Sequence, residues 1–135
     1  MIKYALTYFL TLISFVAIDL VWLMWLARPT YMAEMGSLLR KEPRLGAAIA
    51  FYILYAAGLM LFAISPGLKT GSTLHGLFLG AALGLVAYGT YDLTNLSVVE
   101  GFNLRIALID LAWGTALSAV TSAFVVTIAK MIFAE

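Results

Sequence analysis

The sequence predicts an all-α integral membrane protein, built as an up-down bundle of four transmembrane helices. Of the 135 residues, 64% are hydrophobic and only 11% are charged, and the mean hydropathy is +1.02. Soluble domains are about half apolar and about a quarter charged, so this composition excludes a soluble domain. The apolar residues fall into four runs that can each cross a hydrocarbon core of about 30 Å. These runs use most of the chain, which predicts a single domain over residues 1–135.

The first apolar run predicts a membrane span over about residues 4–27. It exceeds the roughly 7 to 15 residues of a signal h-region, and Leu26-Ala27-Arg28-Pro29 is a poor cleavage site, so we expect an uncleaved helix. Trp22 and Trp25 near its end are typical of an aromatic belt at the membrane surface. Pro29 marks where the helix should end.

The connection from Arg28 to Arg44 is the longest polar stretch. Its apolar residues fall at helical spacing, which favours a short interfacial helix. Gly36 lies in the middle of the pattern, and an ordinary polar loop explains the stretch equally well.

The second run predicts a span over about residues 45–64, which should end at the Ser65-Pro66-Gly67 breaker cluster. It carries no charge. Tyr52 and Tyr55 lie three residues apart on one face, and tyrosines in such a helix more often pack with a satisfied hydroxyl group than act in catalysis.

The third run predicts a span over about residues 73–96. Gly76, Gly80 and Gly84 recur every four residues and predict close approach of another helix backbone. The same row of the helix continues through Tyr88 to Asp92, and Asn95 can reach the same side.

The fourth run predicts a span over about residues 104–133. Asp110 begins a face of small and polar residues at spacings of three and four, which should point into the bundle. Its members are Asp110, Gly114, Ser118, and Thr121 or Ser122. Trp113 follows Asp110 as Trp22 follows Asp19, but the four-residue match of IDLVW and IDLAW is too short to establish an internal repeat.

An up-down arrangement places Asp19, Asp92 and Asp110 at similar depth, about 5 to 12 Å below one membrane boundary. We call this end of the bundle side B, and the end with both chain termini side A. Tyr52 lies at the same depth, and Arg28 or Arg105 could pair with one carboxylate. Carboxylates are costly in hydrocarbon and usually face a partner or a substrate path. We therefore expect one polar site for ligand or proton binding, with residues Asp19, Asp92, Asp110, Tyr52, Tyr88, Asn95, Trp22, Trp113 and Arg105.

Two interpretations of this cluster remain open. In one, each aspartate only joins helices by a hydrogen bond of about 1 kcal/mol. In the other, the carboxyl groups lie together, and desolvation and repulsion favour the protonated form of at least one of them. Such a group can relay protons, bind a cation or act as a general acid or base. The catalytic residues, if any, are unknown.

Other chemistries find little support in the sequence. His75, the only histidine, should lie near side A, away from the aspartates, which argues against a histidine metal site or a Ser-His-Asp triad. A hard-cation site made of aspartate oxygens is conceivable, but no tight spacing supports it. We expect no metal and no cofactor. The absence of cysteine excludes thiolate chemistry, and a net charge of +1 without a basic run argues against nucleic acid.

The phrases FVAIDLVWL, FYILYAAG, VAYGTYDLTNL and LIDLAWGTAL resemble a family of small bacterial inner-membrane proteins, catalogued as domain of unknown function 2177. The resemblance covers nearly the whole chain. It implies a four-helix protein of the bacterial inner (cell) membrane with no assigned activity. Members are often encoded near lipid-modifying enzymes, which hints at a lipid or another apolar ligand.

Three functions follow as hypotheses. The first is binding or transport of a small or lipid-like substrate, coupled to protons or a cation. The second is a lipid-active membrane enzyme or an accessory subunit of lipid modification. The third is a structural or partner-stabilising protein without a site. The bilayer is the certain partner, and a homo-oligomer remains open.

Overall fold

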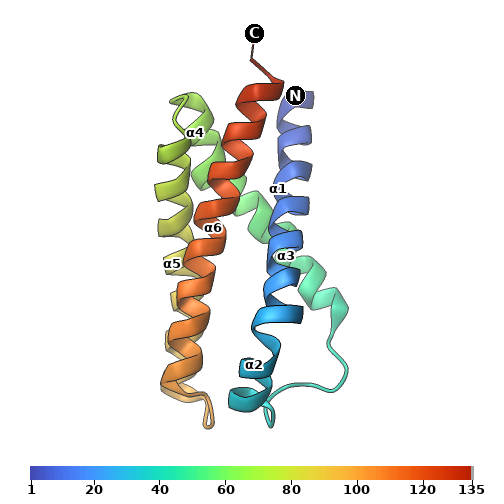
Figure 1. Cartoon of the computed structure of the whole chain (residues 1–135), viewed down its shortest axis with the longest axis vertical. Coiled ribbons are helices and arrows are strands. Elements are labelled where there is room, and N and C mark those ends of the chain that lie inside the picture. Colours follow the sequence, from blue (N-terminus) through green and yellow to red (C-terminus); the bar gives the residue numbers. More distant parts are fainter. Residues whose placement is uncertain (135) are drawn as a thin grey trace.

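The computed structural model describes residues 1–134 and consists of helices that run side by side along one axis (Figure 1). Four of them are long and apolar enough to cross a membrane: Ile2–Leu26, Leu45–Lys69, Thr73–Val98 and Leu104–Ile132. Both termini lie at one end of the bundle, and the first loop and the loop between Val98 and Leu104 lie at the other (Figure 1). The predicted up-down bundle is therefore confirmed, with sides A and B as defined from the sequence.

The helical elements follow the four spans with two interruptions. In chain order they are α1 (Ile2–Val21), the π-helical turn η1 (Trp22–Leu26), α2 (Arg28–Met35), α3 (Leu45–Leu59), the π-helical turn η2 (Met60–Ile64), α4 (Ser65–Lys69), α5 (Thr73–Val98) and α6 (Leu104–Ile132). α2 is the short helix expected in the first loop. Ser72 and Asn103 cap α5 and α6 by accepting hydrogen bonds from the third amide ahead.

Each π-helical turn precedes a proline. Pro29 and Pro66 both stand at the first positions of the helix that follows a turn. In a regular α-helix a proline ring meets the carbonyl group four residues earlier, and a widened turn relieves that clash. The expectation that the second span ends at Ser65-Pro66-Gly67 is therefore wrong, because the turn lets the helix continue to Lys69.

The glycine row of α5 forms the closest helix contact. A Cβ atom on Gly80 would lie 2.5 Å from the Ser118 carbonyl oxygen, and one on Gly84 would lie 2.4 Å from the Gly114 carbonyl oxygen. No larger residue fits at either position without a shift of the backbone. The predicted glycine contact is confirmed, and its partner is the small-residue face of α6.

α1 and the end of the second span complete the core. α1 buries one row of residues at a spacing of four: Thr7, Thr11, Phe15 and Asp19. Phe15 packs in one cluster with Leu59 and Leu117. The first half of α3 leans away from α5 and α6 (Figure 1), and most of its side chains are exposed.

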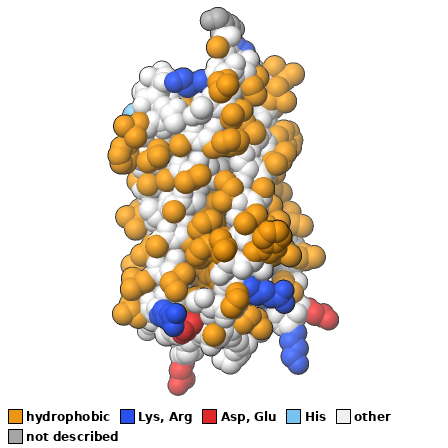
Figure 2. Space-filling model, in the orientation of Figure 1, with side chains coloured by type: hydrophobic (Ala, Val, Ile, Leu, Met, Phe, Trp, Pro, Cys, Tyr) orange, Lys and Arg blue, Asp and Glu red, His pale blue; other side chains and the backbone are white. Residues whose placement is uncertain are grey.

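The surface agrees with a membrane location. Figure 2 shows hydrophobic side chains over the whole middle of the visible face, while charged side chains gather near the two ends. An apolar belt between two charged ends is the pattern that a bilayer requires. The chain is a multi-pass membrane protein with four candidate spans.

Candidate functional site

Asp19 joins three helices through two hydrogen bonds. The Tyr52 hydroxyl group on α3 donates to Asp19 Oδ2 at 2.7 Å, and Trp113 Nε1 on α6 donates to Asp19 Oδ1 at 3.0 Å. Only 6% of the Asp19 surface is exposed, so both oxygens are buried and partnered. This carboxyl group has the environment expected of an interhelical contact.

Trp22 and Trp113 bring the two IDLxW phrases together. Their rings stack with centroids 4.3 Å apart and an angle of 7° between the planes. Trp22 was expected in an aromatic belt, but it lies half-buried against Trp113, whereas Trp25 is 78% exposed. The stack fixes the end of α1 against the start of α6.

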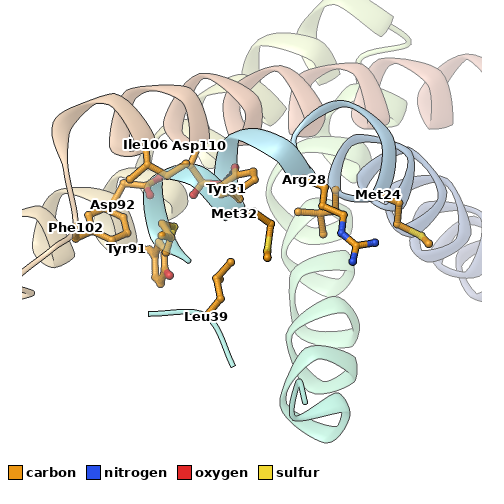
Figure 3. A pocket seen from close by; sticks show the side chains of 12 residues that line it. Met24, Arg28, Tyr31, Met32, Leu39, Tyr91, Asp92, Phe102, Ile106 and Asp110 are labelled. Carbon is orange, nitrogen blue, oxygen red and sulfur yellow. Dashed lines mark hydrogen bonds between the residues drawn. The ribbon is translucent and has the colours of Figure 1, made fainter. Parts of the chain in front are cut away.

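Asp110 is held by the short helix of the first loop. The Tyr31 hydroxyl group on α2 donates to Asp110 Oδ1 at 2.6 Å (Figure 3). Burial, together with the bond to Asp110, raises the pKa of Tyr31. The phenol therefore stays protonated and remains a donor to this carboxyl group.

Asp92 has no such donor. Its side chain is fully buried at 0% exposure, and neither of its carboxyl oxygens has a hydrogen-bond partner among the described residues. The Asp110 carboxyl group lies beside it on the wall of the same cavity (Figure 3). Buried polar groups are almost always partnered, so a carboxyl group without a protein donor is a candidate to bind a proton, an ion or a ligand.

α2 is fastened over side B by a second set of contacts. Asn103 Nδ2 donates to Glu34 Oε2 at 2.6 Å, and the Arg105 guanidinium donates to Glu34 Oε1 at 3.2 Å. Tyr31 and Met35 also pack against a small apolar cluster around Ile106. α2 thus packs against the start of α6.

A cavity of about 420 Å³ lies between α2, the end of α1 and the side B ends of α5 and α6. Its lining is apolar and aromatic apart from a few polar groups: Leu23, Met24, Arg28, Tyr31, Met32, Met35, Leu39, Tyr91, Asp92, Phe102, Ile106 and Asp110. Figure 3 shows Asp92, Asp110 and Tyr31 together at one end of this lining and Arg28 at the other. We call it the side B cavity.

A second cavity also borders the Asp110 carboxyl group. A cavity of about 390 Å³ lies between the leaning α3 and helices α5 and α6. Its lining combines aromatic rings, among them Phe51, Tyr88 and Tyr91, with Asp110. Tyr88 can take this place because α6 has a glycine opposite, where a Cβ atom on Gly114 would lie 2.0 Å from the Tyr88 ring. Asp110 therefore borders both openings.

The structure divides the residues predicted for the site. Asp19, Tyr52, Trp22 and Trp113 form one connected group, and Asp92 and Asp110 form another on the wall of the side B cavity. Tyr88 lies near both groups.

Two of the predicted residues do not join either group. Asn95 faces Tyr91, and Arg105 binds Glu34 rather than an aspartate. Arg28, the other arginine considered as a partner, points away from the aspartates (Figure 3).

Tyr31 was missed as a site residue. In the sequence it belongs to the apolar spacing of the first loop, and its contact with Asp110 joins residues 79 positions apart. The same holds for Glu34, whose partners lie on α6 and in the loop before it. Only the helical spacing of the loop gave a signal, and it could not indicate where the helix docks.

Comparison with known proteins gives a family and no closer relative. The model of a family described as a predicted membrane protein, DUF2177, matches residues 4–127 of the chain. No curated protein and no solved structure is significantly similar to it.

Proposed function

The chain belongs to the DUF2177 family of predicted membrane proteins, and on that premise we propose that it binds a small or lipid-like molecule in the side B cavity, with a proton or cation exchanged at Asp92 and Asp110. The bacterial inner membrane is the proposed location. The proposal covers binding, with or without transport.

The observation that carries this proposal is the state of Asp92. It is fully buried, both oxygens are unpartnered, and it lies beside a second carboxyl group on the wall of a cavity. Leaving a buried polar group unpartnered costs about 1 to 3 kcal/mol, and more for a charged one. A group that only joined helices would have a donor, as Asp19 has.

The cavity has the composition of a ligand site. Pockets for small molecules are mostly apolar, hold a few convergent polar groups and measure about 300 to 1,000 Å³. The side B cavity, at about 420 Å³, combines methionine, leucine and aromatic side chains with two carboxyl groups, two phenols and one guanidinium group. The opening beside α3 supplies a route for a molecule dissolved in the bilayer.

Coupling to a proton or cation follows from the carboxyl pair. Two buried carboxyl groups side by side repel each other when both are charged, so a proton or a cation lowers the cost of placing them together. A proton held by the pair and a ligand in the cavity would therefore influence each other. Tyr31 bonds to Asp110 and links the pair to α2.

Mass spectrometry of the purified protein tests the proposal. The protein is purified in a mild detergent and transferred intact into the mass spectrometer. The small molecules that stay bound to it are then identified by their mass. We expect a retained molecule in the wild type and its loss in Met32→Trp, which fills the cavity from a side chain that is 54% exposed and so does not disturb the core. Met131→Trp is the matched control, because Met131 is 72% exposed near side A and lies outside the cavity lining. Equal retention by both variants would contradict binding at this site.

A further inference from the structure

We propose that the ligand of the side B cavity is an amphipathic monocation, a protonated or quaternary amine with an apolar body, whose positive group lies against Asp110 and Asp92. This inference rests on the proposed function and adds the charge class of the ligand. Four observations support it.

The first observation is the charge around the carboxyl pair. The titratable side chains around it are acidic or phenolic, apart from one arginine: Asp19 from α1, Arg28 and Tyr31 from α2, Tyr55 from α3, and Tyr88 and Tyr91 from α5. Arg28 is exposed and points away from the pair (Figure 3). Because no basic side chain within residues 1–134 bonds to the pair, an anionic headgroup would be repelled and a cation attracted.

The second observation is the missing donor at Asp92. Both of its oxygens are buried and unpartnered, and the carboxyl group beside it is half-buried and reachable from the cavity. A positive group placed at Asp110 would also be close to the charge of Asp92 behind it. A pair that holds one proton carries a single negative charge, which matches a monocation.

The third observation is the aromatic and thioether lining. Tyr91 and Phe102 lie with their ring centroids 6.1 Å apart in an edge-to-face pair at the wall of the cavity. Aromatic faces attract ammonium groups, with the strongest effect where water is excluded. Met24, Met32 and Met35 offer flexible, polarisable contacts for an apolar body.

The fourth observation separates an organic cation from a metal ion. Among residues 1–134, no three aspartate, glutamate or histidine side chains come together in a group that could hold a metal. Hard divalent ions take about six oxygen ligands in proteins. Two carboxyl groups in an apolar cavity suit an amine better than such an ion.

Equilibrium dialysis of the protein in an uncharged maltoside detergent tests the charge class with three probes. They are benzyltrimethylammonium, its uncharged carbon isostere neopentylbenzene, and the anion benzylsulfonate, each corrected for its partition into protein-free micelles. We expect saturable binding of the cation, at least about tenfold tighter than that of the other two. Asp92→Asn and Asp110→Asn should each weaken cation binding about tenfold or more. Glu100→Gln, which removes the same charge from an exposed residue at side B, should leave it unchanged.

The outcomes distinguish the two proposals. If the isostere or the sulfonate binds as tightly as the cation, the cation class is refuted and the ligand cavity stands. If none of the three binds and the purified protein retains no molecule, both proposals fail. If the cation binds equally well to the wild type and to both aspartate variants, the assignment of its site to Asp92 and Asp110 is overturned.

A measurement on the wild type covers the case in which an aspartate variant does not fold. Benzyltrimethylammonium keeps its charge at every pH, so a change in its affinity reports on the protein. We expect its affinity to rise from about pH 5 to about pH 9 as protons leave the carboxyl pair, because cation and proton compete for the same oxygens. Affinity independent of pH in this range would contradict binding at the pair.

Discussion

The three intramembrane aspartates share a depth but differ in their surroundings. Asp19 accepts hydrogen bonds from two other helices, Asp110 accepts one from Tyr31, and Asp92 accepts none. A carboxyl group with two donors stabilises the helices that it joins. A buried carboxyl group with no donor costs free energy, and for this reason the proposed binding site centres on Asp92 and not on Asp19.

Replacing these aspartates by asparagine should therefore have opposite effects on stability. Asp19→Asn removes one of two acceptor oxygens and leaves Tyr52 or Trp113 without its partner, so we expect a loss of about 1 to 3 kcal/mol in the free energy of unfolding. Asp92→Asn replaces an unpartnered carboxyl group by an amide that can donate to Asp110, so we expect unchanged or slightly higher stability. Unfolding by titration with a denaturing detergent measures both. Equal losses in the two variants would show that Asp92 is also a structural contact.

The carboxyl pair should also show energetic coupling. The two groups lie near each other on one cavity wall (Figure 3), so neutralising one changes the cost of burying the other. In a cycle of Asp92→Asn, Asp110→Asn and the double variant, we expect a departure from additivity of about 0.5 to 3 kcal/mol. The control cycle combines Asp92→Asn with Thr127→Val. Thr127 bonds to Thr73 near side A, so this pair should be additive within about 0.5 kcal/mol. Additivity in both cycles would contradict a shared site.

At the scale of the helices, much of the fold could be predicted because it depends on local patterns. The apolar runs indicated four spans, and Gly76, Gly80 and Gly84 indicated the face by which α5 meets another helix. The continuation of the second helix past Pro66 was not predicted, because a proline normally ends a helix. Here a π-helical turn makes room for its ring.

The site was less predictable than the helices. The expected depth in the membrane placed the three aspartates at the same level. Their roles, however, depend on which side chains donate hydrogen bonds to them, and these donors come from distant parts of the chain. Tyr31 reaches Asp110 across 79 positions, and Trp113 reaches Asp19 across 94. No periodicity in the sequence specifies which hydroxyl or indole group meets which carboxyl group.

The contact between α5 and α6 can be tested with one methyl group. In Gly80→Ala, the new Cβ atom would lie 2.5 Å from both the Ser118 carbonyl oxygen and Ser122 Oγ. The helices must then separate, and we expect a loss of about 1 to 3 kcal/mol in unfolding free energy. Gly46→Ala is the control: it is also in a helix, on α3, but its Cβ atom would meet nothing within 4 Å. Its stability should be unchanged or higher by up to about 1 kcal/mol. Equal behaviour of the two variants would mean that α5 and α6 do not pack through Gly80.

At the scale of the whole molecule, the candidate site lies near one end of the bundle. The side B cavity is lined by α2 and by the side B ends of α5 and α6, whereas the opening beside α3 has a mostly aromatic lining. One carboxyl group, Asp110, lines both. Under the proposed function, the side of the membrane that side B faces decides which compartment exchanges protons or ligands with the pair.

The distribution of basic residues predicts this orientation. Side B carries five of them, Arg28, Arg40, Lys41, Arg44 and Arg105, against Lys3, Lys69 and Lys130 on side A. Basic residues near the ends of spans favour the cytoplasmic side, so we expect side B in the cytoplasm and both termini outside. Single cysteines can report the orientation without competing thiols, since the chain contains no cysteine.

Ser37 is a suitable labelling position for side B and Thr70 for side A, because both are exposed. The neighbouring Gly71 is unsuitable, since its φ of +66° is a conformation that a cysteine would strain. In intact cells, we expect a membrane-impermeant maleimide to label Thr70→Cys and to leave Ser37→Cys unlabelled until the membrane is opened. Labelling of Ser37→Cys alone would reverse the orientation. Labelling of both would indicate that the chain inserts in two directions. A difference of only two basic residues, five against three, is small enough to allow this.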